Sequence, residues 1–458
     1  KNSIELNPRK INFTKVGSFG AFDSKVATAL SLVVTELIHN ALEHGLANTG
    51  DQLSVEIVKI NDKYKVAVVD NGAGLPVGFN IEKSANLGLQ IANTLTKNEL
   101  NRLSKARKTY DKPVLIRTQE EATKIEKTKS KKTKTWKFVA KNVRDYAFAT
   151  SRKFIWYAMA VDFNGKSVMA YSLYSKEANP LYGEHSTRAV AQTLKTYSKY
   201  TFDYPYHKAI SVDGQMGMEY PQICFNPGRP EADGTYSDRV KYRMIKVTIH
   251  EVGHNFFPMI VNSDERQWTW MDEGLNSYVE MLAELAYDKN FPITRGYPKN
   301  IVKYMSGDQS KIAPIMSKGD NVYEFGNNAY GKPATALWIL RETIMGQELF
   351  DHAFRTYSQR WMFKHPTPAD FFRSMEDASA MDLDWFWRGW FYTTDVTDIG
   401  IKGVKKFIKE DAEKDVNFIE DMSEGLTFSS ENAKKAKSNF FYEITFNKPG
   451  GLVMPIIA

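Results

Sequence analysis

This 458-residue chain contains one cysteine, Cys224, so no disulfide can form within it and its stability must come from packed cores. No stretch reaches the roughly 18 consecutive apolar residues of a membrane-spanning helix, so we expect no membrane span. The 28 glycines and 17 prolines are too few for a collagen-like chain, and 13% aromatic residues are too many for a disordered one. The length of this globular chain predicts roughly three domains.

The net charge of +7 comes from one segment of the chain. Residues 102–153 hold 17 Lys or Arg against 5 Asp or Glu, so the remainder is net negative. Within that segment, residues 124–137 read KIEKTKSKKTKTWK, which could attract nucleic acid or an anionic membrane surface. No aromatic interleaving or nucleic-acid motif accompanies these lysines, which favours a solvated linker or an exposed strand and loop. We therefore expect no nucleic-acid partner.

The first motif of the N-terminal hundred residues lies on a predicted helix. Apolar residues recur at helical spacing over residues 27–46, while Glu36 and Asn40 share another face of that helix. A carboxylate and an amide four residues apart can together hold a hydrated Mg²⁺ ion.

Two glycine-containing motifs follow this helix. Residues 53–60 and 63–69 alternate as the two strands of a hairpin, and the second strand runs directly into Asp70 and a glycine turn. Glycine lets the backbone approach a flat ligand, and Asp70 can accept a hydrogen bond from an exocyclic amine. Residues 84–90 then open another apolar helix, whose N-terminal amides could meet a phosphate.

In this order, the three motifs resemble the GHKL ATP-binding fold, specifically the catalytic domain of bacterial sensor histidine kinases. The resemblance covers about residues 1–100 and implies an α/β-sandwich domain that binds ATP and Mg²⁺. It places Asn40 at the Mg²⁺ position with Glu36 beside it, and it assigns adenine recognition to Asp70. It assigns the two glycine boxes to Gly72, Gly74 and Gly88. An unrelated α+β domain with a glycine turn would explain each motif singly but not their order.

A stronger pattern stands in residues 244–261, which we predict to be a mostly apolar helix with a break near Pro258. His250 and His254 are four residues apart, so one helix aims both imidazoles in the same direction, as two ligands of one zinc ion require. Glu251 lies about 100 degrees round the helix from His250, where it can reach a water at the metal without replacing a ligand. It is the natural general base.

The third ligand is predicted at Glu273. It follows His254 after eighteen intervening residues and lies in residues 268–280, which read as the start of a second helix with Asp272 near its cap. Two satisfied histidines on a core helix are the alternative interpretation. The motif with its distant carboxylate is the pattern of gluzincin aminopeptidases, and residues 103–458 resemble the aminopeptidase N family.

Two further segments carry that resemblance. Residues 216–220, MGMEY, resemble the family's G-x-M-E-N exopeptidase motif, although Met216 stands for its Gly and Tyr220 for its Asn. The resemblance implies that Glu219 binds the free α-amine of the substrate, with Gly217 and Met218 beside it. Residues 330–333, YGKP, resemble the family's Tyr-x-Lys-Gly segment, which implies that the Tyr330 hydroxyl stabilises the oxyanion. An exposed loop carboxylate and a packed aromatic are the alternatives for these two side chains.

The resemblances predict a mixed, multidomain chain. Residues 1–100 would be a GHKL-type domain lacking its last strands, and 103–182 the end of an N-terminal β-domain. Residues 183–398 would form a thermolysin-like α+β zinc domain, and 399–458 the start of a β-rich C-terminal domain. The ATP-binding resemblance ends near residue 100 without the last strands of that fold, and the peptidase resemblance begins at residue 103 with only the end of its N-terminal β-domain. We therefore hypothesise that two unrelated sequences have been joined. We also expect the chain to be processed or a fragment, and a peptide map across residues 94–108 would test the join.

The leading hypothesis is therefore a zinc-dependent aminopeptidase acting on peptides with a free N-terminus. The alternative is an ATP-binding signalling module fused to a passenger or inactive peptidase, and a third possibility is a truncated protein that keeps zinc without turnover. The compartment stays open, because the peptidase part suggests a periplasmic or secreted protein and the ATPase part a cytoplasmic one.

Overall fold

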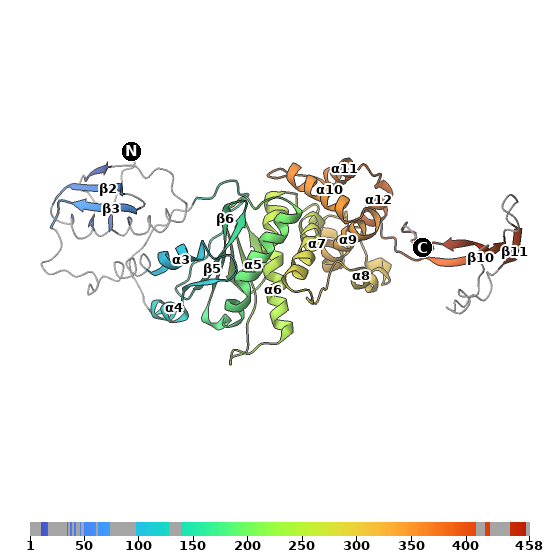
Figure 1. Cartoon of the computed structure of the whole chain (residues 1–458), viewed down its shortest axis with the longest axis horizontal. Helices are drawn as coiled ribbons and strands as arrows, with labels where there is room; N and C mark the ends of the chain where they lie inside the picture. The colour runs from blue at the N-terminus through green and yellow to red at the C-terminus, as the bar shows by residue number, and fades with distance from the viewer. Residues whose placement is uncertain are drawn as a thin grey trace. The chain divides into compact units, whose positions relative to one another are not determined.

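The structure is a computed structural model that describes residues 11–16, 34, 37–38, 41–42, 46, 50–60, 63–73, 98–127, 139–408, 417–421 and 440–454 (Figure 1). The chain divides into two compact units, one of residues 1–121 with 156–159 and one of residues 122–155 with 160–458. Both helices and strands occur in each unit, which confirms the predicted mixed class.

The first unit contains a small sheet with strand order β1-β2-β3. Its strands are β1 (Asn12–Val16), β2 (Gln52–Ile60) and β3 (Lys63–Asp70), in which β1 and β2 are parallel and β2 and β3 antiparallel. The hairpin predicted from the alternation of residues 53–69 is therefore confirmed. Its apolar face contacts a cluster built around Ala41, Leu46 and Leu53.

The remaining described elements of this part are short. They are α3 (Leu100–Ala106), β4 (Val114–Arg117), which pairs antiparallel with residues 156–158 of β5 (Ile155–Phe163), and α4 (Gln119–Glu126). Arg102 donates two hydrogen bonds to Glu121, of 2.7 and 2.9 Å, which tie α3 to the start of α4. We expected a linker or an exposed strand and loop over residues 124–137. Residues 124–126 instead belong to α4, and residues 128–138 lie outside the described part.

The second unit carries a mostly parallel group of strands. β6 (Lys166–Tyr174), β7 (Lys208–Asp213) and β9 (Ile223–Asn226) run parallel, and the short β8 (Met218–Tyr220) pairs antiparallel with β9. The single cysteine, Cys224, lies on β9 with 1% of its surface exposed.

Three long helices pack beside these strands: α5 (Leu181–Tyr200), α6 (Asp238–Gly253) and α7 (Thr269–Tyr287), which lie side by side in Figure 1. Gly253 makes the close approach possible, because a Cβ atom there would come within 2.2 Å of the Tyr197 hydroxyl. The Asn276 amide nitrogen on α7 donates to the carbonyl oxygen of His250 on α6, and its oxygen accepts a hydrogen bond from Tyr197 on α5. One buried side chain therefore connects all three helices.

Further helices complete the second unit. They are α8 (Pro298–Met305), α9 (Lys332–Ile339), α10 (Gln347–Arg360), α11 (Pro368–Ser379), α12 (Asp384–Tyr392), three short 3-10 turns (Lys176–Ala178, Gln309–Lys311, Gly319–Asn321) and three π-helical turns (Asn255–Ile260, Gly326–Gly331, Leu340–Ile344). Four aromatic residues of α12 are buried, and the Trp387 ring lies 4.6 Å from that of Phe372. No helix of the described residues is long and apolar enough to cross a bilayer.

The C-terminal region forms a separate antiparallel sheet of order β11-β10-β12. Its strands are β10 (Gly400–Ile408), β11 (Asn417–Asp421) and β12 (Phe440–Asn447). Residues 451–457 form a mostly apolar run typical of a strand, but its described part, residues 451–454, forms none, and Gly451 makes only an isolated bridge to Val396. The run is interrupted where Gly451 takes a positive φ of 83°, which an extended strand does not accommodate.

Candidate metal centre

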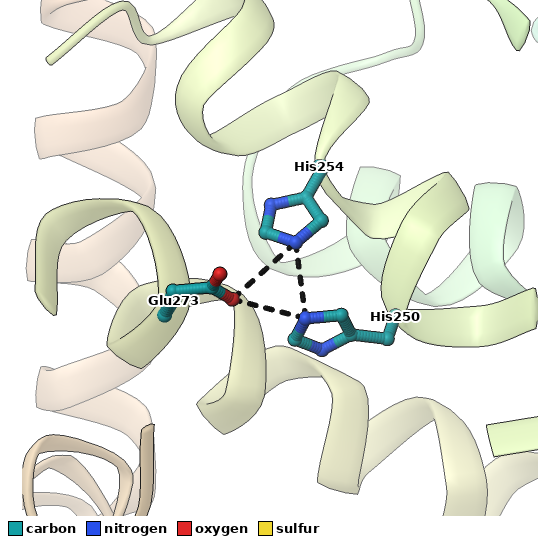
Figure 2. A group of neighbouring side chains, drawn as sticks. All are labelled: His250, His254 and Glu273. Atoms are coloured by element: carbon teal, nitrogen blue, oxygen red, sulfur yellow. Dashed lines mark hydrogen bonds and ion pairs between the residues drawn. The ribbon is translucent and has the colours of Figure 1, made fainter. Parts of the chain in front are cut away.

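Two helices bring three metal-binding side chains together. His250 lies on the last turn of α6, His254 caps that helix, and Glu273 lies on the second turn of α7. Their donor atoms converge, as Figure 2 shows: the two Nε2 atoms are 3.0 Å apart, and Glu273 Oε2 lies 3.0 Å from the first and 3.5 Å from the second. Tetrahedral zinc ligands at bond lengths near 2.1 Å stand about 3.4 Å from one another.

The other ring nitrogens of the histidines are held by acceptors. His250 Nδ1 lies 2.8 Å from Glu280 Oε2, and His254 Nδ1 lies 2.9 Å from the Phe257 carbonyl oxygen and 2.8 Å from Asp272 Oδ1. These acceptors place the ring protons on Nδ1, so both Nε2 lone pairs face Glu273 and each other. Two Nε2 atoms and one carboxylate oxygen that converge on one point form a donor set that fits zinc.

The end of α6 lies close to the predicted break near Pro258. Regular α-helix ends at Gly253, and residues 255–260 form a π-helical turn in which Phe257 has non-helical φ and ψ angles. The following Pro258 cannot donate a backbone hydrogen bond, so the helix opens here and turns the Phe257 carbonyl toward His254.

Glu251 lies beside the donor set and is buried, with 6% of its surface exposed. Its Oε2 atom has no hydrogen-bond partner among the described residues. Burial, opposed by the two neighbouring histidines, raises the pKa of Glu251 to about 7. Gly217 packs against it, because a Cβ atom at that position would come within 2.3 Å of Glu251 Oε1. A buried carboxyl group without a protein partner is suited to accept a proton from a water molecule.

Glu219 is held near the same site by the β8–β9 hairpin. Its carboxylate belongs to a group with His254 and Asp272 whose donor atoms all lie within 4.8 Å of one another. The hairpin turn is fixed to the end of α6 because Gln222 N donates a 2.7 Å hydrogen bond to Asn255 Oδ1. The preceding residue, Met218, is exposed on β8. The structure therefore brings Glu219 to the His254 side of the donor set.

Tyr330 approaches from the His250 side. It lies on the π-helical turn before α9, its ring stacks on the His250 ring with centroids 5.7 Å apart, and its hydroxyl donates a 2.6 Å hydrogen bond to Glu273 Oε1. Burial and the Glu273 carboxylate raise the pKa of Tyr330 above its ordinary range, which leaves a neutral phenol. The Tyr330 phenol therefore lies on the His250 side of the histidine pair, and the Glu219 carboxylate lies on the His254 side.

Three neighbouring side chains were not predicted from the sequence. Asp272 lies in the first turn of α7, near the cap as expected, and its contact with His254 was not predicted. Glu280 contacts His250, and Lys246 forms ion pairs of 3.0 Å with Glu280 and 3.3 Å with Glu284. Glu280 follows Glu273 by seven residues, a spacing of two helical turns that places both on one face of α7 and could have indicated the contact.

Of the predicted ATP-site residues, the described part includes Asp70 and Gly72. Asp70 Oδ1 accepts a 3.0 Å hydrogen bond from Gly72 N at the end of β3. The Asp70 carboxylate thus stabilises the turn that follows this strand. The other predicted residues of that site lie outside the described residues, namely Glu36, Asn40, Gly74 and Gly88.

Comparisons with known proteins match different parts of the chain to different proteins. Residues 184–390 match the peptidase family M1 domain. The matched residues include both histidines, Glu251, Glu273, Glu219 and Tyr330. A leucine aminopeptidase 2 of Emericella nidulans is 29% identical over 163 residues, which cover 32% of this chain and 26% of that protein. The crystal structure of an M1 zinc metallopeptidase from Deinococcus radiodurans is similar with a TM-score of 0.41 and 16% identity, covering 54% of this chain and 53% of that one.

The N-terminal part matches a different protein. The sensor histidine kinase PdtaS of Mycobacterium tuberculosis is 43% identical over 102 residues, which cover 22% of this chain and 20% of the kinase. The chain thus spans about a fifth of the length of the kinase and about a quarter of that of the leucine aminopeptidase.

Proposed function

We propose that the second unit is a zinc-dependent aminopeptidase. The observation that carries the proposal is the convergence of two Nε2 atoms and one carboxylate oxygen within 3.5 Å, beside the buried and unpartnered Glu251 Oε2. His250, His254 and Glu273 would hold the metal. A zinc ion there would supply Lewis-acid chemistry, which lowers the pKa of a water and polarises a peptide carbonyl.

The chain's own residues divide the remaining tasks. Glu251 would take the proton of the attacking water and deliver it to the leaving amine, which its burial beside the donor set permits. Tyr330 would donate its hydroxyl hydrogen to the developing oxyanion, exchanging its present bond to Glu273 for one to the substrate. Glu219 would pair with the terminal ammonium of the substrate and so reject internal peptide bonds, which lack that charge.

Metal analysis and hydrolysis of aminoacyl fluorogenic amides test this function together. We expect about one zinc per chain and hydrolysis that disappears when the substrate amine is acetylated. Glu251→Gln keeps the size of the side chain and should retain zinc while losing hydrolysis by several orders of magnitude. Near-wild-type turnover in Glu251→Gln would disprove the general-base assignment, and unchanged cleavage of the acetylated amide would disprove the exopeptidase assignment.

We propose a second function for the N-terminal part, namely ATP and Mg²⁺ binding of the histidine-kinase type. The 43% identity to a sensor histidine kinase over 102 residues favours it. Glu36 and Asn40 would hold the metal, Asp70 would read the adenine, and the glycine boxes would meet the phosphates. Calorimetry with ATP and Mg²⁺ should show binding that is lost in Asp70→Asn and in Asn40→Asp. Equal affinity in the wild type and both variants would exclude this site.

A further inference from the structure

A cavity of about 280 Å³ opens in the second unit beside Tyr330. Its lining includes one cation, Arg295, and the polar side chains of Thr294, Asn300, Asn327 and Thr335, and no carboxylate belongs to it. Gly331, the residue after Tyr330, also lines it. The volume is close to the lower limit of small-molecule pockets, about 300 Å³, and suits a short fragment of a peptide.

Arg295 lies at the border between this cavity and the metal centre. Its guanidinium carbon lies 4.3 Å from the centre of the Tyr330 ring. The side chain keeps 31% of its surface exposed, and within the described part of the chain its N–H groups make no hydrogen bond. A guanidinium that stacks on an aromatic ring retains its in-plane donors for a second partner.

The nearest carboxylate does not use these donors. Glu280 Oε2 lies 3.9 Å from Arg295, whereas the same carboxylate group contacts His250 Nδ1 at 2.8 Å and Lys246 Nζ at 3.0 Å. Glu280 is therefore already paired at shorter range. Among the described residues Arg295 thus keeps only this long ion pair, and its N–H groups can still donate hydrogen bonds to an anion in the cavity.

The position of the cavity indicates which part of a peptide would reach it. Glu219 lies on the His254 side of the donor set, whereas Tyr330, Arg295 and Glu280 lie on the His250 side. A peptide whose terminal amine is held at Glu219 therefore extends its leaving residues toward Arg295.

We propose that Arg295 and this cavity bind a carboxylate on the leaving-group side of the peptide. The inference rests on the proposed aminopeptidase function and names a substrate class, namely peptides with an anionic group close behind the scissile bond. That group is either the C-terminal carboxylate of a dipeptide or an acidic side chain at the second residue. A guanidinium binds both with paired, charge-assisted hydrogen bonds.

Two substrate pairs separate the sources of the carboxylate. The first pair is X-Ala against X-Ala-amide, and the second is X-Asp-amide against X-Asn-amide, where X is the first residue of the best fluorogenic amide. In the wild type, kcat/KM should favour the anionic member of at least one pair. Arg295→Gln should reduce that anionic-to-neutral ratio about 10- to 100-fold, the scale of a hydrogen bond to a charged group.

Lys299→Gln is the matched control for charge. Lys299 is exposed, lies four residues from Arg295 and does not line the cavity. Its substitution removes the same charge, and the ratio should change less than twofold.

A ratio that is unchanged in both pairs, or an equal loss on anionic and neutral substrates, would overturn the proposal. The equal loss would mean that Arg295 acts only through the Tyr330 ring. Equal ratio changes in Arg295→Gln and Lys299→Gln would also overturn it, because a general charge effect would then suffice.

Binding without turnover separates this inference from the proposed activity. In zinc-loaded Glu251→Gln protein, calorimetry should show tighter binding of Ala-Ala than of Ala-Ala-amide, or of Ala-Asp-amide than of Ala-Asn-amide. Adding Arg295→Gln should abolish that preference. If the wild type cleaves no substrate but the preference and its loss are observed, the aminopeptidase function fails and the carboxylate site stands. If cleavage occurs and no preference is found, the carboxylate site fails alone.

Discussion

Glu280→Gln should weaken zinc binding although Glu280 is not a ligand. Its carboxylate holds His250 Nδ1 at 2.8 Å and Lys246 Nζ at 3.0 Å, with 1% of the side chain exposed. Burial raises the pKa of Glu280, but Lys246 and His250 lower it more, so the group is ionised at neutral pH. A glutamine cannot satisfy both partners, because its NH₂ group would face either the Nδ1 proton or the Lys246 ammonium.

The size of the effect follows from this pairing. The substitution removes one negative charge from a buried group at the Nδ1 side of a proposed metal-binding imidazole, and it weakens the hydrogen bond that orients that imidazole. Loss of such a partner typically costs 10- to 100-fold in metal affinity, or about 1.4 to 2.7 kcal/mol. Zinc affinity at pH 7, measured by competition with a chromophoric chelator, should fall by that factor.

Glu284→Gln is the matched control. Glu284 lies one turn further along α7 and contacts Lys246 at 3.3 Å without contacting His250. Burial and the neighbouring Glu280 raise the pKa of Glu284 to about 8, so the substitution removes little charge at pH 7. Its zinc affinity should stay within about twofold of the wild type. Equal affinities in Glu280→Gln and the wild type, or equal losses in both variants, would refute the reasoning.

Three further predictions concern the site and its surroundings. Tyr330→Phe should keep zinc and lower kcat about 10²- to 10³-fold, as measured on the aminoacyl amides, and an unchanged kcat would remove Tyr330 from catalysis. Gly217→Ala should displace Glu251, since the added Cβ would lie 2.3 Å from its Oε1, and hydrolysis should fall while circular dichroism stays constant. Burial lowers the pKa of Lys332 to about 8, so between about pH 8 and pH 10.5 the unfolded chain binds more protons than the folded one. Lys332 therefore contributes a rise in stability with pH across that window, and in denaturant unfolding the stability of Lys332→Met relative to the wild type should fall as the pH is raised from about 8 to 10.5.

The metal ligands could be predicted from the sequence because helical geometry fixes them locally. His250 and His254 are one turn apart on a single helix, so their convergence needs no knowledge of the fold. Glu273 required only a second helix start at a suitable distance. The contacts of Asp272 and Glu280 could not be predicted in this way, because they depend on how α7 is rotated against α6.

The remaining site residues show the limit of local reasoning more clearly. Arg295 stands in a loop without a motif, and only the packing of the Gly326–Gly331 turn places it over Tyr330. Glu219 was expected from a family motif, and its position depends on a hydrogen bond from Gln222 to Asn255, two residues that no local pattern connects. Long-range packing of this kind is decided by the whole core, which periodicity does not encode.

The amide of Asn276 has a consequence for how the metal would enter. By bonding α7 to both α5 and α6, it connects the two ligand-bearing helices through protein groups alone. Coordination would then order few additional groups, unlike a zinc finger, whose fold forms only with its metal. Removing the metal with a chelator should therefore abolish catalysis without unfolding the protein. The free energy of unfolding should fall only by the free energy of metal binding.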